Sequence, residues 1–296
     1  MFRKLPTMRA MPRELLAGLF AALPCLSSPL AACEVGLEEA LQPVVVTYEP
    51  FGFVPEAGIT EITLRNEGEE SDLDLFFRPG AFGAPEPFTV TGELVGTARP
   101  LSRVDEDRYR LTLPQGEAAR IVFTARVSAL GVPEPGTRDL TYQLDVLDTG
   151  TGLPCLEDAV LPVRITVPSR AQVNIAGAAG RFVDGPDLYT LDLGTLTTGL
   201  TARVAVQLRA NGDAALSVVS ENAGRLVHET VPDASVPYAL VLDGRALDLS
   251  AESVVPAPPA RSEAGVSLPL DVVVGEVPAL PSGRFRDLVT ITITAL

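Results

Sequence analysis

The chain has 296 residues, and its 23 Lys and Arg residues against 38 Asp and Glu residues give a formal net charge of −15. Such an acidic protein repels polyanions, which argues against nucleic acid or an anionic lipid surface as a partner. The sequence has one histidine and three cysteines. This scarcity excludes zinc sites built on two histidines and weakens any argument for a Ser-His-Asp triad.

The start of the chain has the pattern of a secretory signal peptide. Basic residues from Arg3 to Arg13 come first, an apolar stretch follows over Leu15–Leu26, and small residues lead to Ala32. The apolar stretch is shorter than the about 20 residues that a membrane-spanning helix needs. We therefore expect residues 1–32 to be a signal peptide and the rest of the chain to be exported and soluble.

Two cysteines remain after removal of the expected signal peptide, Cys33 and Cys155. In an oxidising compartment two cysteines most simply form one disulfide. The sequence Leu30-Ala31-Ala32-Cys33 also fits a bacterial lipoprotein box, in which Cys33 would be acylated and Cys155 would be a lone thiol. We expect the disulfide, because it leaves no lone thiol in an exported protein.

Beyond residue 32 the sequence has the pattern of short β-strands. The 26 prolines and 25 glycines of the chain separate segments in which apolar and polar residues alternate, such as 204–208, 238–242 and 268–274. No segment carries the 3.6-residue apolar stripe of a helix between caps. Many short alternating segments separated by turn signals are typical of an all-β sandwich.

The two halves of the chain resemble each other in two places. Residues 58–68 read GITEITLRNEG, and residues 199–212 read GLTARVAVQLRANG. Nearer the end of each half, PGTRDLTYQLDVL at 135–147 corresponds to PSGRFRDLVTITI at 281–293. A repeat of about 150 residues indicates a duplicated domain, because solenoid repeats are much shorter. The sequence therefore predicts two tandem immunoglobulin-like β-sandwiches.

We place the N-terminal sandwich at residues 33–168 and the C-terminal one at residues 169–296. The first half continues after its Arg-Asp-Leu strand into another alternating segment, Leu161–Val167, whereas the second half ends at Leu296. We therefore expect the C-terminal sandwich to lack its last strand and to have an unpaired sheet edge. The alternative is an ordinary last strand in a complete sandwich.

The expected unpaired edge is the alternating segment at the end of the chain. Val289, Ile291, Ile293 and Ala295 alternate there with threonines. We expect these four side chains to face the core, while the backbone of the same strand borders the vacant position. Such an edge is prone to aggregation unless another chain supplies a strand, which is the recognition mode called β-augmentation.

Five segments of the C-terminal half occur in a recognisable order. They are Leu191-Asp-Leu-Gly-Thr-Leu196, Val206-Gln-Leu-Arg-Ala-Asn211, Ser220–Leu226, Val236–Gly244 and Gly283–Thr292. In this order and spacing the C-terminal half resembles the spore coat protein U family, the pilin-type domain of archaic chaperone–usher pili. The N-terminal half resembles a more divergent copy, with Cys33-Glu-Val and Tyr48-Glu-Pro-Phe51 near its start.

This resemblance implies a subunit held by a periplasmic chaperone, passed to an outer-membrane usher and joined to a neighbouring pilin subunit by donor-strand exchange. A complete first sandwich followed by an incomplete second one looks like a tip subunit, which accepts a strand and donates none. The resemblance therefore implies secretion through the periplasm to the tip of a pilus or fimbria on the cell surface. The first sandwich would then serve in cell adhesion and biofilm formation.

In related tip adhesins, loops at one pole of the first domain bear exposed apolar residues that attach to surfaces. This sequence offers three apolar loops framed by Pro and Gly, at 51–55, 79–85 and 129–133. Their candidate binding residues are Phe51, Phe53, Val54, Phe82, Leu130 and Val132. Exposed apolar residues are costly unless they contact something, which favours a binding role. The alternative is that the phenylalanines pack back into the core.

The sequence lacks the motifs of an enzyme. His228 follows an alternating segment, and we expect it on the surface. Asp148-Thr149-Gly150 matches the aspartic-protease triplet, but that chemistry needs two carboxylates and a second triplet is absent, so we expect a plain turn. We expect no catalytic residue, cofactor or metal. The alternatives to a pilus tip adhesin are a lipid-anchored or periplasmic two-domain binding module and, more remotely, an exported hydrolase.

Overall fold

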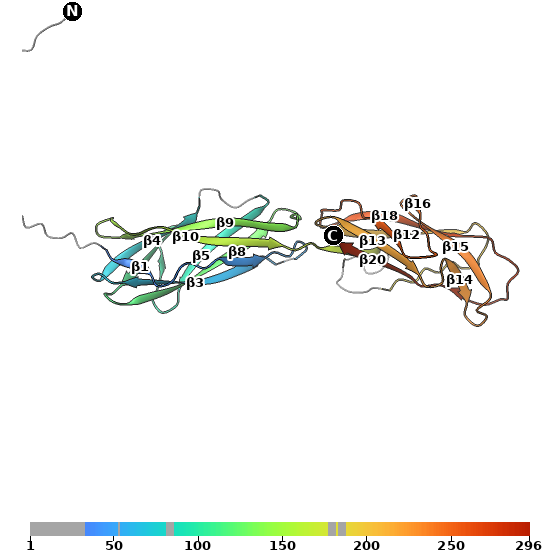
Figure 1. The fold of residues 1–296 in the computed structure, drawn as a ribbon, viewed down its shortest axis with the longest axis horizontal. Helices are drawn as coiled ribbons and strands as arrows, with labels where there is room; N and C mark the ends of the chain where they lie inside the picture. The colour runs from blue at the N-terminus through green and yellow to red at the C-terminus, as the bar shows by residue number, and fades with distance from the viewer. Residues whose placement is uncertain (1–32, 53, 81–85, 177–181, 183–187) are drawn as a thin grey trace, which may run out of the picture. The chain divides into compact units, whose positions relative to one another are not determined.

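The computed structural model describes residues 33–52, 54–80, 86–176, 182 and 188–296. Within these ranges every regular element is a β-strand, and no helix is present that could cross a membrane (Figure 1). The strands form four sheets, which pack as two sandwiches with separate apolar cores. The predicted all-β fold of two sandwiches is confirmed.

The first sandwich consists of a four-stranded and a six-stranded sheet. The four-stranded sheet has the order β1 (Val35–Leu37), β3 (Glu56–Asn66), β8 (Ala118–Ala129) and β5 (Phe88–Gly96). The six-stranded sheet has the order β2 (Val44–Thr47), β10 (Pro154–Val167), β9 (Gly136–Asp148), β4 (Ser71–Pro79), β7 (Arg108–Leu113) and β6 (Ser102–Arg103).

The core of the first sandwich follows from the alternation of its strands, because every second side chain of a strand points to the same face. Three aromatic rings meet at its centre: Phe77 stacks on Tyr142, and the Phe123 ring is tilted against both. A Cβ atom at Gly92 would lie 2.8 Å from the Phe123 ring and 2.9 Å from that of Tyr142. Glycine at this position of β5 therefore lets the edge strand approach the aromatic cluster.

The last strand of the first sandwich, β10, is paired on both sides. It runs antiparallel to β9, from Pro154 opposite Leu147 to Val167 opposite Gly136, and parallel to β2, with Val163 opposite Val44. Its inward side chains Leu161, Val163, Ile165 and Val167 are buried in the core. Near its start, Cys155 forms a disulfide with Cys33, in agreement with the expected pairing and not with an acylated Cys33.

The second sandwich consists of a seven-stranded and a three-stranded sheet. The large sheet has the order β11 (Ala171–Ala176), β12 (Thr201–Ala210), β18 (Val266–Val274), β15 (Ser235–Leu242), β14 (Arg225–His228) and β19 (Phe285–Arg286), and β16 (Arg245–Ala246) pairs with β15. The small sheet has the order β17 (Ser253–Pro256), β13 (Ala214–Ser220) and β20 (Val289–Ala295). The alternating segments 204–208, 238–242 and 268–274 lie in β12, β15 and β18, as predicted.

Candidate functional site

The last strand of the second sandwich, β20, is paired along one side. Its partner is β13, from Ser220 opposite Val289 to Ala214 opposite Ala295. Among the residues that the structure describes, no strand pairs with the other side of β20. An unpaired strand edge presents a row of backbone N–H and C=O groups to any extended segment that reaches it.

The side chains of β20 are less buried than those of its counterpart in the first sandwich. Val289, Ile291 and Ile293 pack against the second core but stay half-buried, and Ala295 is half-buried as well. In β9, which is flanked by β4 and β10, the inward side chains from Leu140 to Val146 are all buried. β9 thus has a paired strand on both sides, whereas β20 has one on a single side.

A second segment of this sandwich packs on the core without joining a sheet. Residues 188–200 precede β12 as β2 precedes β3, and they form no strand. Leu191, Leu193 and Leu196 are nevertheless partly buried against the second core. The corresponding element of the first sandwich, β2, is a strand and pairs with β10. The second sandwich thus has counterparts of both neighbours of β10, but its described residues contain no counterpart of β10 itself.

The chain passes from the large sheet to the small one between β19 and β20. Phe285 and Arg286 pair with β14, whereas Val289 already pairs with β13. In the first sandwich the same Arg-Asp-Leu sequence lies inside the continuous strand β9. Leu140 is 4% exposed there, whereas Leu288 is 49% exposed. Counted from Arg-Asp-Leu, the residues that face the core in β20 are therefore shifted by one position relative to those in β9. Aligning the two Arg-Asp-Leu sequences does not reveal this shift.

The carboxylate of Asp287 holds this crossover in place. It accepts hydrogen bonds from Ser220 Oγ at 2.5 Å, from Tyr238 Oη at 2.5 Å, and from the backbone N–H and Nδ2 of Asn222 at 3.0 Å. The Leu288 N–H also donates to it. Burial and the hydrogen bond to Asp287 raise the pKa of Tyr238 far above its ordinary value, so the phenol stays a donor. Sequence analysis missed this role of Asp287, because its partners are far apart in the chain.

His228 lies in the core and not on the surface, so the sequence-based expectation was wrong. It is 6% exposed and packs edge-on against the Phe285 ring, with centroids 4.9 Å apart. Its Nδ1 accepts from the backbone N–H groups of Thr230 and Val231, which leaves the proton on Nε2 to donate to the Ser282 carbonyl. Burial is tolerated because the turn after β14 satisfies Nδ1 and the Ser282 carbonyl satisfies Nε2.

The structure describes only part of the three apolar loops. Phe53 and Phe82 lie outside the described residues. Phe51 and Val132 are half-buried, whereas Val54 is 73% and Leu130 is 80% exposed.

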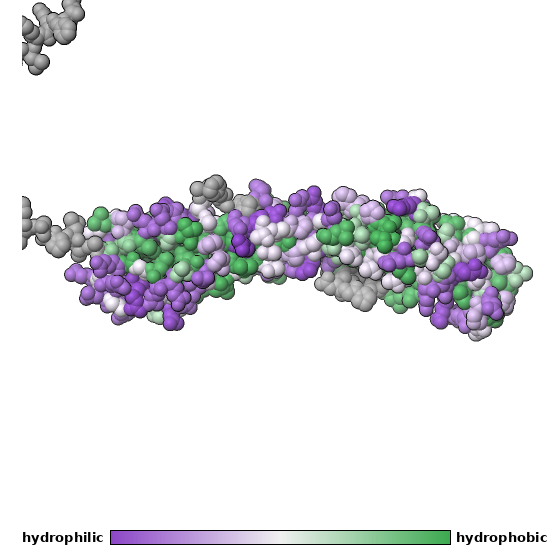
Figure 2. Space-filling view, in the orientation of Figure 1, coloured by the Kyte–Doolittle hydropathy of each residue, from purple (hydrophilic) through white to green (hydrophobic). Residues whose placement is uncertain are grey.

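The described parts of loops 51–55 and 129–133 share one end of the first sandwich. Thr47, at the end of β2, lies opposite Thr166, and Gly136, at the start of β9, lies opposite Val167. Both loops therefore lie at the end where β10 finishes. At the other end, loops 67–70 and 114–117 bear exposed carboxylates, and Figure 2 shows hydrophilic side chains gathered there, near β1 in Figure 1.

The Asp148-Thr149-Gly150 triplet forms the turn between β9 and β10, as predicted. Asp148 Oδ1 accepts hydrogen bonds from Thr151 Oγ1 and from the Thr151 backbone N–H. These bonds lower the pKa of the Asp148 carboxyl. A group of His, Cys, Asp and Glu side chains that could hold a metal ion is absent from the part of the chain that the structure describes.

Comparison with known proteins gives matches among solved structures alone. No protein-family model matches the chain, so the resemblance to the spore coat protein U family stays a prediction, and no curated protein matches it. A chain of the CsuC–CsuE chaperone–tip adhesion subunit complex from archaic chaperone–usher Csu pili of Acinetobacter baumannii is similar, with 10% identity and a TM-score of 0.42. The similarity covers 88% of this chain and 99% of that chain.

Two further solved structures illustrate the range of the matches. CfaE, the adhesive subunit of CFA/I fimbria of enterotoxigenic Escherichia coli, is 14% identical with a TM-score of 0.35, over 92% of this chain and 80% of that one. The secreted serine protease VesC of Vibrio cholerae is 10% identical with a TM-score of 0.24, over 88% of this chain and 51% of that one. TM-scores this low do not distinguish between such different proteins, and the fold assignment rests on the chain's own sheets.

Proposed function

We propose that this protein is the tip subunit of a chaperone–usher pilus and that a strand from another chain completes its second sandwich. The observation that carries the proposal is the edge of β20, which has a partner on one side while its apolar side chains stay half-buried. An edge of this kind accepts an extended segment through backbone hydrogen bonds, and the alternate side chains of that segment fill the apolar face.

The first sandwich supports the proposal because its own strand β10 occupies the position that a strand from another chain would take in the second sandwich. There β10 lies between β9 and β2, antiparallel to the first and parallel to the second. The strand that completes the second sandwich would lie in the same way between β20 and residues 188–196. Its inward positions would carry residues like Leu161, Val163 and Ile165, which are fully buried in β10.

The partners follow from the resemblance of the C-terminal half to pilin-type domains. A periplasmic chaperone supplies the strand first, an outer-membrane usher receives the subunit, and a neighbouring pilin subunit supplies the final strand. In this assignment residues 1–32 are a signal peptide, residues 33–168 are the adhesive sandwich, and residues 169–296 are the pilin-like sandwich. The protein reaches the cell surface through the periplasm and has no enzymatic activity.

Co-expression tests this function. Produced in the periplasm alone, the chain should aggregate or be degraded, because the edge of β20 and its half-buried apolar side chains are exposed to other chains. Co-expressed with its chaperone, it should be recovered as a soluble one-to-one complex. A stable, monomeric chain obtained without a chaperone would refute the proposal and favour two complete sandwiches, as in a periplasmic binding module.

For attachment, we expect the exposed side chains of Val54 and Leu130 to contribute directly, although both lie at the end of the first sandwich from which the chain continues into the second. Replacing both with serine should weaken binding of the chaperone-bound protein to an apolar surface by on the order of tenfold, since burial of each side chain is worth roughly 1 kcal/mol or more. The matched control replaces Glu69 and Glu70, at the other end of the sandwich, with glutamine. Retention on a hydrophobic resin is the measurement, and equal retention of both variants would exclude these loops as the contact surface.

A further inference from the structure

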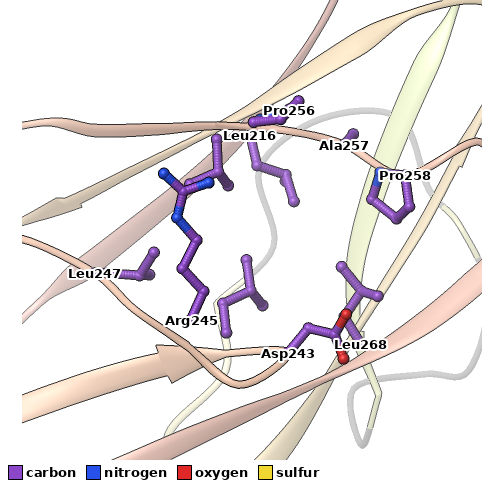
Figure 3. A pocket seen from close by; sticks show the side chains of 10 residues that line it. Leu216, Asp243, Arg245, Leu247, Pro256, Ala257, Pro258 and Leu268 are labelled. Carbon is purple, nitrogen blue, oxygen red and sulfur yellow. The ribbon is translucent and has the colours of Figure 1, made fainter.

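The second sandwich contains an apolar cavity on the side away from β20. The cavity has a volume of about 330 Å³ and is lined by residues of β13, β15, β17 and β18 and of the turn after β15 (Figure 3). Its walls include the core side chains Leu216, Leu242, Leu247, Val255 and Leu268, all of which are buried. The short strand β17 is the edge of the three-stranded sheet, and its residues Val255 and Pro256 line the cavity.

The lining and the volume of the cavity suit a small apolar molecule. The aliphatic side chains that form most of its wall offer no hydrogen bonds to water, so this part of the cavity suits a small apolar ligand. A volume of this size lies at the lower end of the roughly 300–1,000 Å³ that small-molecule sites occupy. A short hydrocarbon chain is therefore the apolar part that fits.

Arg245 places a positive charge at the mouth of this cavity. It pairs with Leu242 across the Asp243-Gly244 turn, and directly opposed residues in an antiparallel pair have their side chains on the same face. Since Leu242 is buried, Arg245 extends on the core side of β16, and Figure 3 shows it reaching along the cavity toward Leu216. Within the described residues no carboxylate lies at ion-pairing distance from its guanidinium.

Asp243 is the other charged residue that lines the cavity. In Figure 3 its carboxylate lies near Leu268, on the side away from the Arg245 guanidinium. Its backbone N–H donates to the Pro269 carbonyl, and with φ values of 49° and 79° Asp243 and Gly244 form the tight turn of the hairpin. The turn therefore fixes the backbone from which both charged side chains leave, and the two charges border different parts of the mouth.

We propose that this cavity binds a short-chain carboxylate, with the hydrocarbon chain among the leucines and the carboxylate beside the guanidinium of Arg245. A guanidinium binds a carboxylate through two parallel hydrogen bonds, a geometry that an ammonium or an alcohol head group does not match. The site is separate from the strand edge, because Leu216 lies between Val255 of β17 and Ile293 of β20 in the small sheet. The inference therefore does not depend on the proposed function.

Calorimetric titration of the full chain, held soluble by its chaperone where needed, tests the site with octanoate, 1-octanol and octylammonium as probes. Octanoate should bind most tightly and octylammonium most weakly. Octanoate should also bind on the order of tenfold more tightly than hexanoate, since each buried methylene adds to the affinity. The Arg245→Met variant, which keeps the apolar stem, should bind octanoate no better than octanol, and its octanol affinity should be unchanged.

A cavity-filling variant locates the site. Ala257→Leu should abolish binding of both octanoate and octanol, because the larger side chain occupies the cavity. If this variant does not fold, methyl resonances of Leu216, Leu242 and Val255 in the unsubstituted protein should shift on addition of octanoate. The proposal is overturned if octanoate does not bind, if Ala257→Leu binds it equally well, if these methyl resonances do not move, or if Arg245→Met leaves the preference for octanoate intact.

Discussion

A strand fused after Leu296 should raise the melting temperature of the second sandwich by roughly 10 °C or more, which corresponds to a net gain of about 3 kcal/mol. The fused segment is the chain's own 149–167, which includes the turn that joins β9 to β10 and the whole of β10. Attached through this turn, it would run antiparallel to β20. Its apolar side chains would then cover Val289, Ile291 and Ile293, which are half-buried without it.

The size of this effect follows from the apolar area that becomes buried. Each Val, Leu or Ile side chain is worth about 1.5–3 kcal/mol when fully buried. Ordering the backbone of the fused strand costs about 1–2 kcal/mol per residue, and burial of its four apolar side chains alone does not outweigh this cost. The backbone hydrogen bonds to β20 and the burial of the β20 side chains that the strand covers supply the rest. The net gain is therefore a small part of the gross burial.

Register supplies the matched control for this experiment. A fused strand of the same composition shifted by one residue would turn Pro162, Arg164 and Thr166 toward the core, since adjacent residues of a strand point to opposite faces. This shifted variant should gain little or nothing in melting temperature. If neither fusion raises the melting temperature, or if both raise it equally, β20 is not the edge of an incomplete sandwich. The first sandwich, measured in the same scan, should be unaffected.

Replacing Asp287 with alanine should destabilise the second sandwich by about 3 kcal/mol. The carboxylate accepts hydrogen bonds from Ser220 and Tyr238, whose side chains are buried, and from the backbone of Asn222 and Leu288. Each buried donor left without an acceptor costs about 1–3 kcal/mol. Because these bonds fix the crossover between β19 and β20, the variant should also take up a completing strand less readily.

Chemical unfolding of the second sandwich and co-purification with the chaperone measure the two effects. Asp287→Asn should cost less than Asp287→Ala, because the amide keeps one acceptor and the two hydroxyl groups can accept from its NH₂. The control is Asp271→Ala, which removes the ion pair with the exposed Arg203 and should cost about 1 kcal/mol or less. Equal losses from Asp271→Ala and Asp287→Ala would contradict the role given to Asp287.

The sequence by itself determined the secondary structure and the division into two sandwiches. Period-2 alternation between Pro- and Gly-rich turns identifies strands such as β12, β15 and β18, because it is a local consequence of the strand's geometry. The pairing of Cys33 with Cys155 also followed from the sequence, since only two cysteines remain beyond residue 32. The alternation of Val289, Ile291 and Ile293 with threonines likewise identified the side chains of β20 that pack against the core.

Only the tertiary structure decided how those strands pair and which of the remaining side chains become buried. The crossover between β19 and β20, the burial of His228 and the cavity beside Arg245 depend on which strands become neighbours, and segments far apart in the chain supply those neighbours. The Arg-Asp-Leu sequence illustrates the reason. In β9 its leucine enters the core, whereas before β20 the chain crosses between sheets and Asp287 collects donors from β13 and β15, so identical local sequences have different surroundings.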